Sequence, residues 1–176
     1  MKALDGVTII DFTQRHAGSV ATMILADFGA KVIKVERADR PDPAREWTPM
    51  QNGHSVYFTY LNRGKEDVCV DYTTEAGRQV ILDLVKTADV VCENLPVGEM
   101  ERYGLDYDSL KAIKPDLIYA SLSPFGLTGP RKNKKADDLT IQAIGGYMDR
   151  TGFADGPATP VGCRVSNHIS AAYLAT

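Results

Sequence analysis

The residues that could bind or act on a ligand follow the predicted strands of this chain. They fall in segments 12–18, 94–96 and 123–130, and at Arg37. In open parallel sheets covered by helices, ligands bind at the carboxyl ends of the strands. The sequence therefore predicts one ligand site, which these segments form together at one edge of a sheet.

Two further groups could contribute. His16 lies in the first of these segments, where it could donate a hydrogen bond to a ligand or cap a helix. Asp137 and Asp138 are adjacent carboxylates before a predicted helix, where negative charge is favourable beside the helix dipole. Asp138 could instead belong to the site.

The elements that must position these residues alternate between strands and helices. Apolar runs predict strands at 7–11, 31–36, 67–71, 89–93 and 117–121. Helical spacing follows the first strand and ends at Gly29, and Thr74 opens a helix whose predicted inner face is Val80, Ile81, Leu84 and Val85. A short helix is expected at 105–113, and 38–55 should be a long loop. This order predicts an α/β fold with a Rossmann-like parallel sheet and helices on both faces.

The last predicted helix covers 167–176, with Ser166 as a possible cap. No Gly, Asn or Pro stop signal closes it, so we expect the domain to continue beyond this sequence.

Composition excludes several classes of protein. The chain has 176 residues, enough for one core, with 20 basic and 23 acidic residues and a net charge of -3. This balance disfavours nucleic acid or an anionic membrane as the main partner. There is no signal-peptide h-region and no run long enough to span a bilayer. Cys69, Cys92 and Cys163 form no CxxC pair, so we expect buried thiols in a reducing, cytoplasmic setting.

A nicotinamide cofactor is the first alternative for such a fold. The first strand is followed by a helix and by a second strand that ends in Glu36, as in dinucleotide-binding folds. However, the turn at 11–18 contains only Gly18, whereas the fingerprint needs three glycines. There is also no P-loop. The sequence therefore argues against both nucleotide sites.

Blocks along nearly the whole chain resemble the class III CoA transferases, most closely the formyl-CoA and oxalate branch. The matching blocks are 4–6, 11–13, 17–18, 27–36, 57–58, 62–65, 89–94, 98–104, 123–130, 142–148 and 151–153. The resemblance implies that residues 1–176 form an N-terminal coenzyme-A-binding domain. It also implies a chain roughly twice as long, with a small C-terminal domain, a glycine-rich loop over the active site, and interlocked dimers.

The resemblance further implies which residues meet the ligand. Coenzyme A would be a substrate rather than a tightly bound cofactor, and no metal is expected. Its phosphates would contact Arg37, Lys65, Arg102 and Lys135, its pantetheine and adenine would lie near Asn94 and Leu95, and Tyr103 would flank the base. Arg131, Lys132 and Lys134 are expected in a solvated loop. His16 occupies a position where this branch tends to place glutamine in the acyl pocket.

Asn167 is the main departure from the family pattern. A count from Thr151 places Asn167 where the family has its nucleophilic aspartate, and Asp155 comes too early to replace it. An amide is a far poorer nucleophile than a carboxylate. The resemblance implies a transferase that moves CoA from an acyl-CoA to a carboxylic acid. A non-catalytic CoA-binding paralogue or subunit is the alternative, and an acyl-CoA racemase, which moves the α-proton with His and Asp, is a more distant one. The acyl group is not identified by the sequence.

Overall fold

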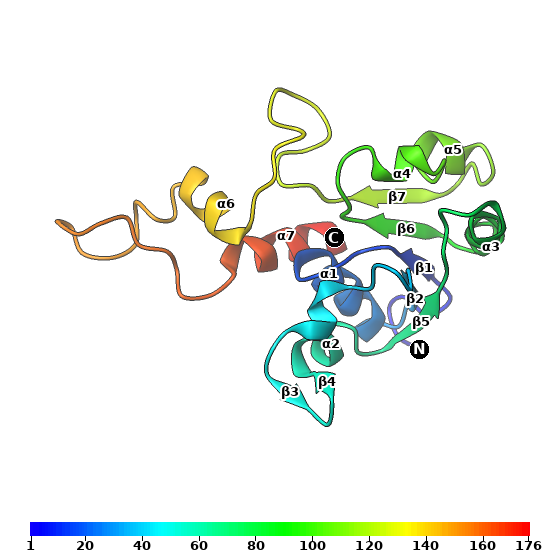
Figure 1. Ribbon diagram of the computed structural model, residues 1–176, viewed down its shortest axis with the longest axis horizontal. Coiled ribbons are helices and arrows are strands. Elements are labelled where there is room, and N and C mark those ends of the chain that lie inside the picture. Colours follow the sequence, from blue (N-terminus) through cyan, green and yellow to red (C-terminus); the bar gives the residue numbers. More distant parts are fainter.

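The computed structural model describes residues 1–176 and has a five-stranded parallel sheet at its centre (Figure 1). The strands are β1 (Thr8–Asp11), β2 (Lys31–Glu36), β5 (Lys65–Cys69), β6 (Val90–Glu93) and β7 (Ile118–Ser121). Their order is β5-β2-β1-β6-β7, and every neighbouring pair is parallel. The first strand therefore lies in the middle, and the chain reaches each edge through helical crossovers.

Helices cover both faces of the sheet, as the sequence predicts. One face carries α1 (Ala17–Asp27), which packs against α7 (Val165–Ala175). The other carries α3 (Glu75–Val85), α4 (Glu99–Arg102) and α5 (Tyr107–Lys111) (Figure 1). Two further short helices are α2 (Val56–Leu61) and α6 (Asp138–Ile144). The longest helix has 11 residues, and none is long and apolar enough to cross a membrane.

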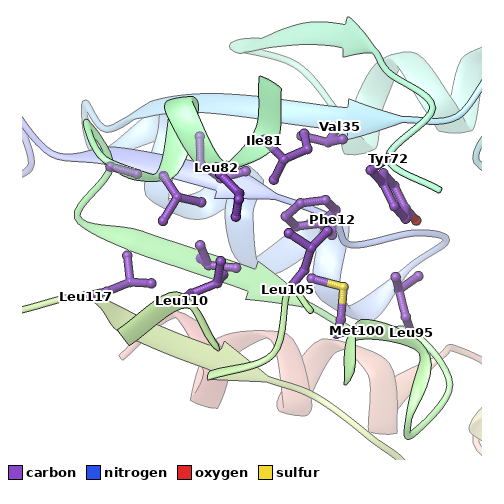
Figure 2. Packing of buried hydrophobic residues seen from close by; sticks show 14 residues of the cluster. Phe12, Val35, Tyr72, Ile81, Leu82, Leu95, Met100, Leu105, Leu110 and Leu117 are labelled. Carbon is purple, nitrogen blue, oxygen red and sulfur yellow. The ribbon is translucent and has the colours of Figure 1, made fainter. Parts of the chain in front are cut away.

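Alternation along β1 divides the core between the two faces. Ile9 points to the α1 side, where it packs with Ala26, Val32 and Cys92. Ile10 points to the other side and joins a cluster of 14 buried residues under α3, α4 and α5. In Figure 2, Phe12, Ile81, Leu105, Met100 and their neighbours converge in this layer. Both faces are buried, which explains why the strands read as apolar runs.

Several local expectations need correction. The inner face of α3 is formed by Ile81, Leu82 and Val85, whereas Val80 is exposed. The apolar positions of this helix fit two registers, and packing against the sheet selects the one that contains Leu82. The short helix expected at 105–113 is present as α5, whereas the short helix α4, before it in the chain, was not predicted. Only Cys92 is a buried thiol, because Cys69 and Cys163 are exposed.

The expected loop at 38–55 also contains regular structure. It holds a 3-10 turn, η1 (Pro43–Glu46), and a hairpin of β3 (Met50–Gln51) and β4 (His54–Ser55). Asn52 and Gly53 join the two strands with φ values of 51° and 80°. Asn-Gly is the pair that a two-residue turn with two positive φ angles favours, so the signal was present in the sequence.

Candidate functional site

Three helices begin around one cavity of about 290 Å³ beyond the carboxyl ends of β1, β6 and β7. His16 and Ala17 come from the start of α1, Asp137 and Asp138 from the start of α6, and Asn167 from the first turn of α7. Unpaired N–H groups at helix starts carry partial positive charge, which attracts anions. The cavity thus brings together the three residues that the resemblance implies for catalysis.

The backbone of Asn167 is fixed by Asp138. The amide N–H of Asn167 donates to Asp138 Oδ1 at 2.8 Å, while Asp138 Oδ2 accepts from Gln142 Nε2 at 2.6 Å. Asp138 therefore caps α7 from a different helix. This replaces the expected cap by Ser166, since α7 begins at Val165 and has no side-chain cap of its own. Asp137 caps α6, where its carboxylate accepts from the backbone N–H of Thr140.

His16 is buried and stacks edge-on against His168. Their ring centroids lie 4.7 Å apart, and the two Nε2 atoms are 3.4 Å apart. Burial, followed by the neighbouring His168 and Arg164, lowers the pKa of His16 to about 4, and Asp138 opposes this shift. His16 is therefore neutral at physiological pH. It stands at the helix cap position but makes no side-chain cap bond, so capping does not explain it.

A buried ionic network holds the loop that carries Arg15 and His16. Lys34 Nζ donates to the carbonyl of Thr13 at 2.7 Å and to Asp42 at 3.0 Å, and Asp42 accepts the backbone N–H of Arg15. Arg15 adopts a φ of 65°, which costs energy in a non-glycine residue and needs such support. No sequence pattern indicates this network, because Lys34 lies within an apolar run that predicts a strand.

Asn94 fixes the same loop from the other side. Its amide oxygen accepts from the backbone N–H of Gln14 at 2.7 Å, and its nitrogen donates to the carbonyl of Gln14 at 2.9 Å. Gly18 permits this close approach, because a Cβ there would lie 2.5 Å from Thr13 and 3.1 Å from Asn94. Asn94 lines the cavity, so the residue both shapes the loop and borders the site.

The residues predicted to contact coenzyme A divide into separate groups. Arg37, Tyr103 and Arg102 lie together: the guanidinium of Arg37 is over the Tyr72 ring, Tyr72 meets Tyr103, and Arg102 is over Tyr103. Arg37 donates a hydrogen bond to the exposed Asp39. Lys135 is exposed and precedes Ala136, which lines the cavity.

Lys65 and Leu95 do not fit the predicted role. The Lys65 side chain is 1% exposed, and its Nζ donates to Asp11, Ser19 and Asn62, which uses all three N–H groups. The side chain of Leu95 is buried in the core. Neither offers a free group to a ligand. Both positions are strand exits or match family blocks, and sequence position alone does not separate a ligand contact from a core contact.

Several cavity residues were missed by the sequence reasoning. They are Trp47, Arg164, Ser166 and Ser170. Trp47 comes from the segment 38–55, and the guanidinium of Arg164 lies over its ring. These residues come from two distant parts of the chain, and no spacing pattern in the sequence links them. No group of three His, Cys, Asp or Glu side chains is arranged to hold a metal ion.

Comparison with known proteins identifies the family of the chain and agrees with its fold. The description "CoA-transferase family III" applies to residues 4–176. The chain is 44% identical to the acetyl-CoA:oxalate CoA-transferase of Acetobacter aceti, over 90% of this chain and 41% of that protein. It is 39% identical to a formyl-CoA:oxalate CoA-transferase of Rhodopseudomonas palustris, over 99% of this chain and 41% of that protein.

A solved structure shows the same architecture. A CAIB/BAIF family protein from Brucella suis superposes with a TM-score of 0.93 at 40% identity, covering 99% of this chain and 47% of that one. The chain thus spans less than half the length of these relatives. With the family matched over nearly all its residues, the chain belongs to CoA-transferase family III.

Proposed function

We propose that this chain forms the acyl-CoA site of a protein that transfers CoA between an acyl-CoA and a small dicarboxylic acid. One observation carries the proposal: Asn167, His16 and Asp138 share one cavity at the start of three helices. The resemblance places Asn167 at the position of the family's nucleophile. Both relatives described above are named as oxalate CoA-transferases, and oxalate is a dicarboxylic acid.

The cavity suits the charges of such a reaction. In the family's chemistry a carboxylate attacks the thioester carbonyl, CoA thiolate leaves, and the carbonyl oxygen carries negative charge in between. Helix N-termini aimed at this oxygen would stabilise it. Arg15 and Arg164 line the same cavity and supply positive charge for the second carboxylate of the acid.

The phosphates of CoA would lie at the cluster of Arg37, Arg102 and Tyr103. Two guanidinium groups there can contact phosphate oxygens, and the aromatic rings offer a surface for the adenine. Arg37 would exchange its present partner, Asp39, for a phosphate. We also propose that Lys135 closes over the ligand from the exposed loop, whereas Lys65 serves the fold.

The amide side chain of Asn167 supports a second candidate function, that of a CoA-binding protein that makes no covalent intermediate. The amide can donate or accept hydrogen bonds, but it cannot form the acyl anhydride. Racemisation is less favoured, because both oxygens of Asp138 are already occupied by Asn167 and Gln142. Asp138 would have to break a bond to act as a base.

Binding and transfer assays on the purified protein separate these candidates. CoA should bind to the natural protein under both candidates, whereas transfer between acetyl-CoA and oxalate supports the transferase and its absence supports the CoA-binding protein. Asn167→Asp should raise the rate by several orders of magnitude, because a covalent nucleophile is commonly worth about 5–8 kcal/mol of barrier. Asn133→Asp makes the same change in the exposed loop and should leave the rate unchanged. Absence of CoA binding would contradict both candidates.

A further inference from the structure

Unpartnered polar atoms are concentrated in the residues around the Asn167 cavity. Four buried side-chain polar atoms in the structure have no hydrogen-bond partner. Three of them, His16 Nδ1, Ser123 Oγ and Ser166 Oγ, belong to residues that line this cavity, and the fourth, Ser19 Oγ, does not. Buried polar groups are nearly always paired, so such a concentration calls for a ligand that supplies the missing partners.

The hydrogen bonds of His168 determine what His16 can offer. His168 Nδ1 lies 2.8 Å from the carbonyl oxygen of Arg164. A carbonyl oxygen only accepts, so His168 Nδ1 carries a proton, and in the neutral ring His168 Nε2 is a bare acceptor. His16 Nε2 lies 3.4 Å from this atom and must donate to it. The proton of neutral His16 is therefore on Nε2, and Nδ1 is a bare acceptor.

The three atoms differ in the kind of hydrogen-bond partner that they need. His16 Nδ1 needs a donor, whereas each serine hydroxyl can either donate or accept. A carboxylate only accepts and would face the lone pair of His16, and a methyl group would satisfy none of the three atoms. A hydroxyl group can donate to His16 and accept from a serine at the same time.

We propose that His16, Ser123 and Ser166 form a subsite for a hydroxyl group on the acyl chain, so that the site prefers a 2-hydroxyacyl-CoA over the unsubstituted acyl-CoA. This inference rests on the proposed function, because it needs the acyl group of a CoA thioester to enter the cavity. His16 is 6% exposed and Ser166 is 9% exposed, so a hydrogen bond left unmade in this subsite is costly. Sites built to bond a hydroxyl discriminate strongly against analogues without it.

Titration calorimetry at pH 8, where an ordinary imidazole is neutral, tests the preference. Glycolyl-CoA and acetyl-CoA differ by one hydroxyl group. We expect glycolyl-CoA to bind the purified protein at least about tenfold more tightly, which corresponds to about 1.4 kcal/mol. Ser123→Ala with Ser166→Ala, and separately His16→Leu, should reduce this ratio to about threefold or less, while CoA itself binds as before.

Ser19→Ala is the matched control. It removes a hydroxyl that is equally buried and equally unpartnered but lies outside the cavity, so the ratio should stay at its natural value. Equal affinity for glycolyl-CoA and acetyl-CoA, with CoA still bound, would overturn the hydroxyl subsite alone. A uniform loss of affinity for CoA and both thioesters in the His16 variant would overturn it too, because His16 would then meet an amide N–H of the pantetheine arm. If no CoA compound binds, the proposed function fails as well.

Discussion

The side chain at position 167 is placed by its neighbours rather than by its own contacts. Its backbone N–H donates to Asp138, and the residue lines the cavity. A carboxylate of similar size can therefore take its place without a change in the fold. A comparison of asparagine with aspartate at position 167 can therefore separate CoA binding from covalent catalysis.

The buried pair of Asp11 and Lys65 is the clearest residue-scale prediction for stability. Burial raises the pKa of Asp11, but Lys65, Lys34 and the hydroxyls of Thr13 and Thr22 outweigh burial, and the net pKa is lowered. Asp11→Asn leaves the Lys65 amine buried beside a neutral group. We expect a loss of about 3–5 kcal/mol in urea denaturation.

The exposed ion pair of Asp83 and Lys86 provides the comparison. Its side chains are more than half exposed, so Asp83→Asn should cause no measurable change. If Asp11→Asn proved equally harmless, the buried pair of Asp11 and Lys65 would not be a main support of the fold.

His16 predicts a pH dependence of stability. Its pKa is about 4 in the folded protein and near 6.5 in the unfolded chain. Between pH 6.5 and pH 4, the unfolded chain therefore binds a proton at this residue that the folded chain does not. Stability should therefore fall as pH drops from 7 to 4.5, by about 1–2 kcal/mol after allowance for solvent screening. His16→Gln should remove this part of the slope. His54→Gln, at an exposed position, should leave it intact, and equal slopes in all three proteins would contradict the burial of His16.

At the scale of elements, the strands were the most predictable part. Four predicted strands have boundaries within one residue of the observed ones, because apolar runs buried on both faces give a strong signal. The strand predicted at 67–71 is observed at Lys65–Cys69, since charged residues at this edge of the sheet obscure the pattern. Helix registers such as that of α3 depend on tertiary packing that one sequence does not contain.

The sequence could identify individual site residues but not how they meet. Residue type and position in the chain single out Asn167, His16 and Asp138 as candidate site residues, and the three do line one cavity. The cap that Asp138 gives to α7 spans 29 positions of sequence, and the contact of His16 with His168 spans 152. Such long-range contacts depend on the topology of the sheet and are not encoded in local spacing.

The cap between α6 and α7 predicts a local effect on α7. Asp138→Ala removes the acceptor of the Asn167 N–H and should cost about 1–2 kcal/mol. Hydrogen exchange should show faster exchange of this amide than in the natural protein. Asp138→Asn keeps one acceptor oxygen and should have the smaller effect. Unchanged exchange in the alanine variant would mean that Asp138 does not fix the start of α7.

At the scale of the whole molecule, the residues between β7 and α7 form an arm that extends away from the sheet (Figure 1). Large apolar side chains on this arm are exposed, with Phe153 at 92% and Ile144 at 55%, and Tyr173 on α7 is 79% exposed. Exposed apolar surface of this kind marks contact with other protein. We therefore expect the purified protein to be a dimer by multi-angle light scattering, and a stable monomer would contradict the interlocked arrangement.

The most direct test of the account is the covalent chemistry of position 167. The Asn167→Asp variant is incubated with acetyl-CoA, trapped with hydroxylamine or acid, and digested for mass spectrometry. We predict an acyl or CoA adduct, or a hydroxamate, on the peptide that contains residue 167, and no such product in the natural protein. A variant that binds CoA but forms no adduct there, or an adduct on another residue of the natural protein, would contradict the assignment of this cavity.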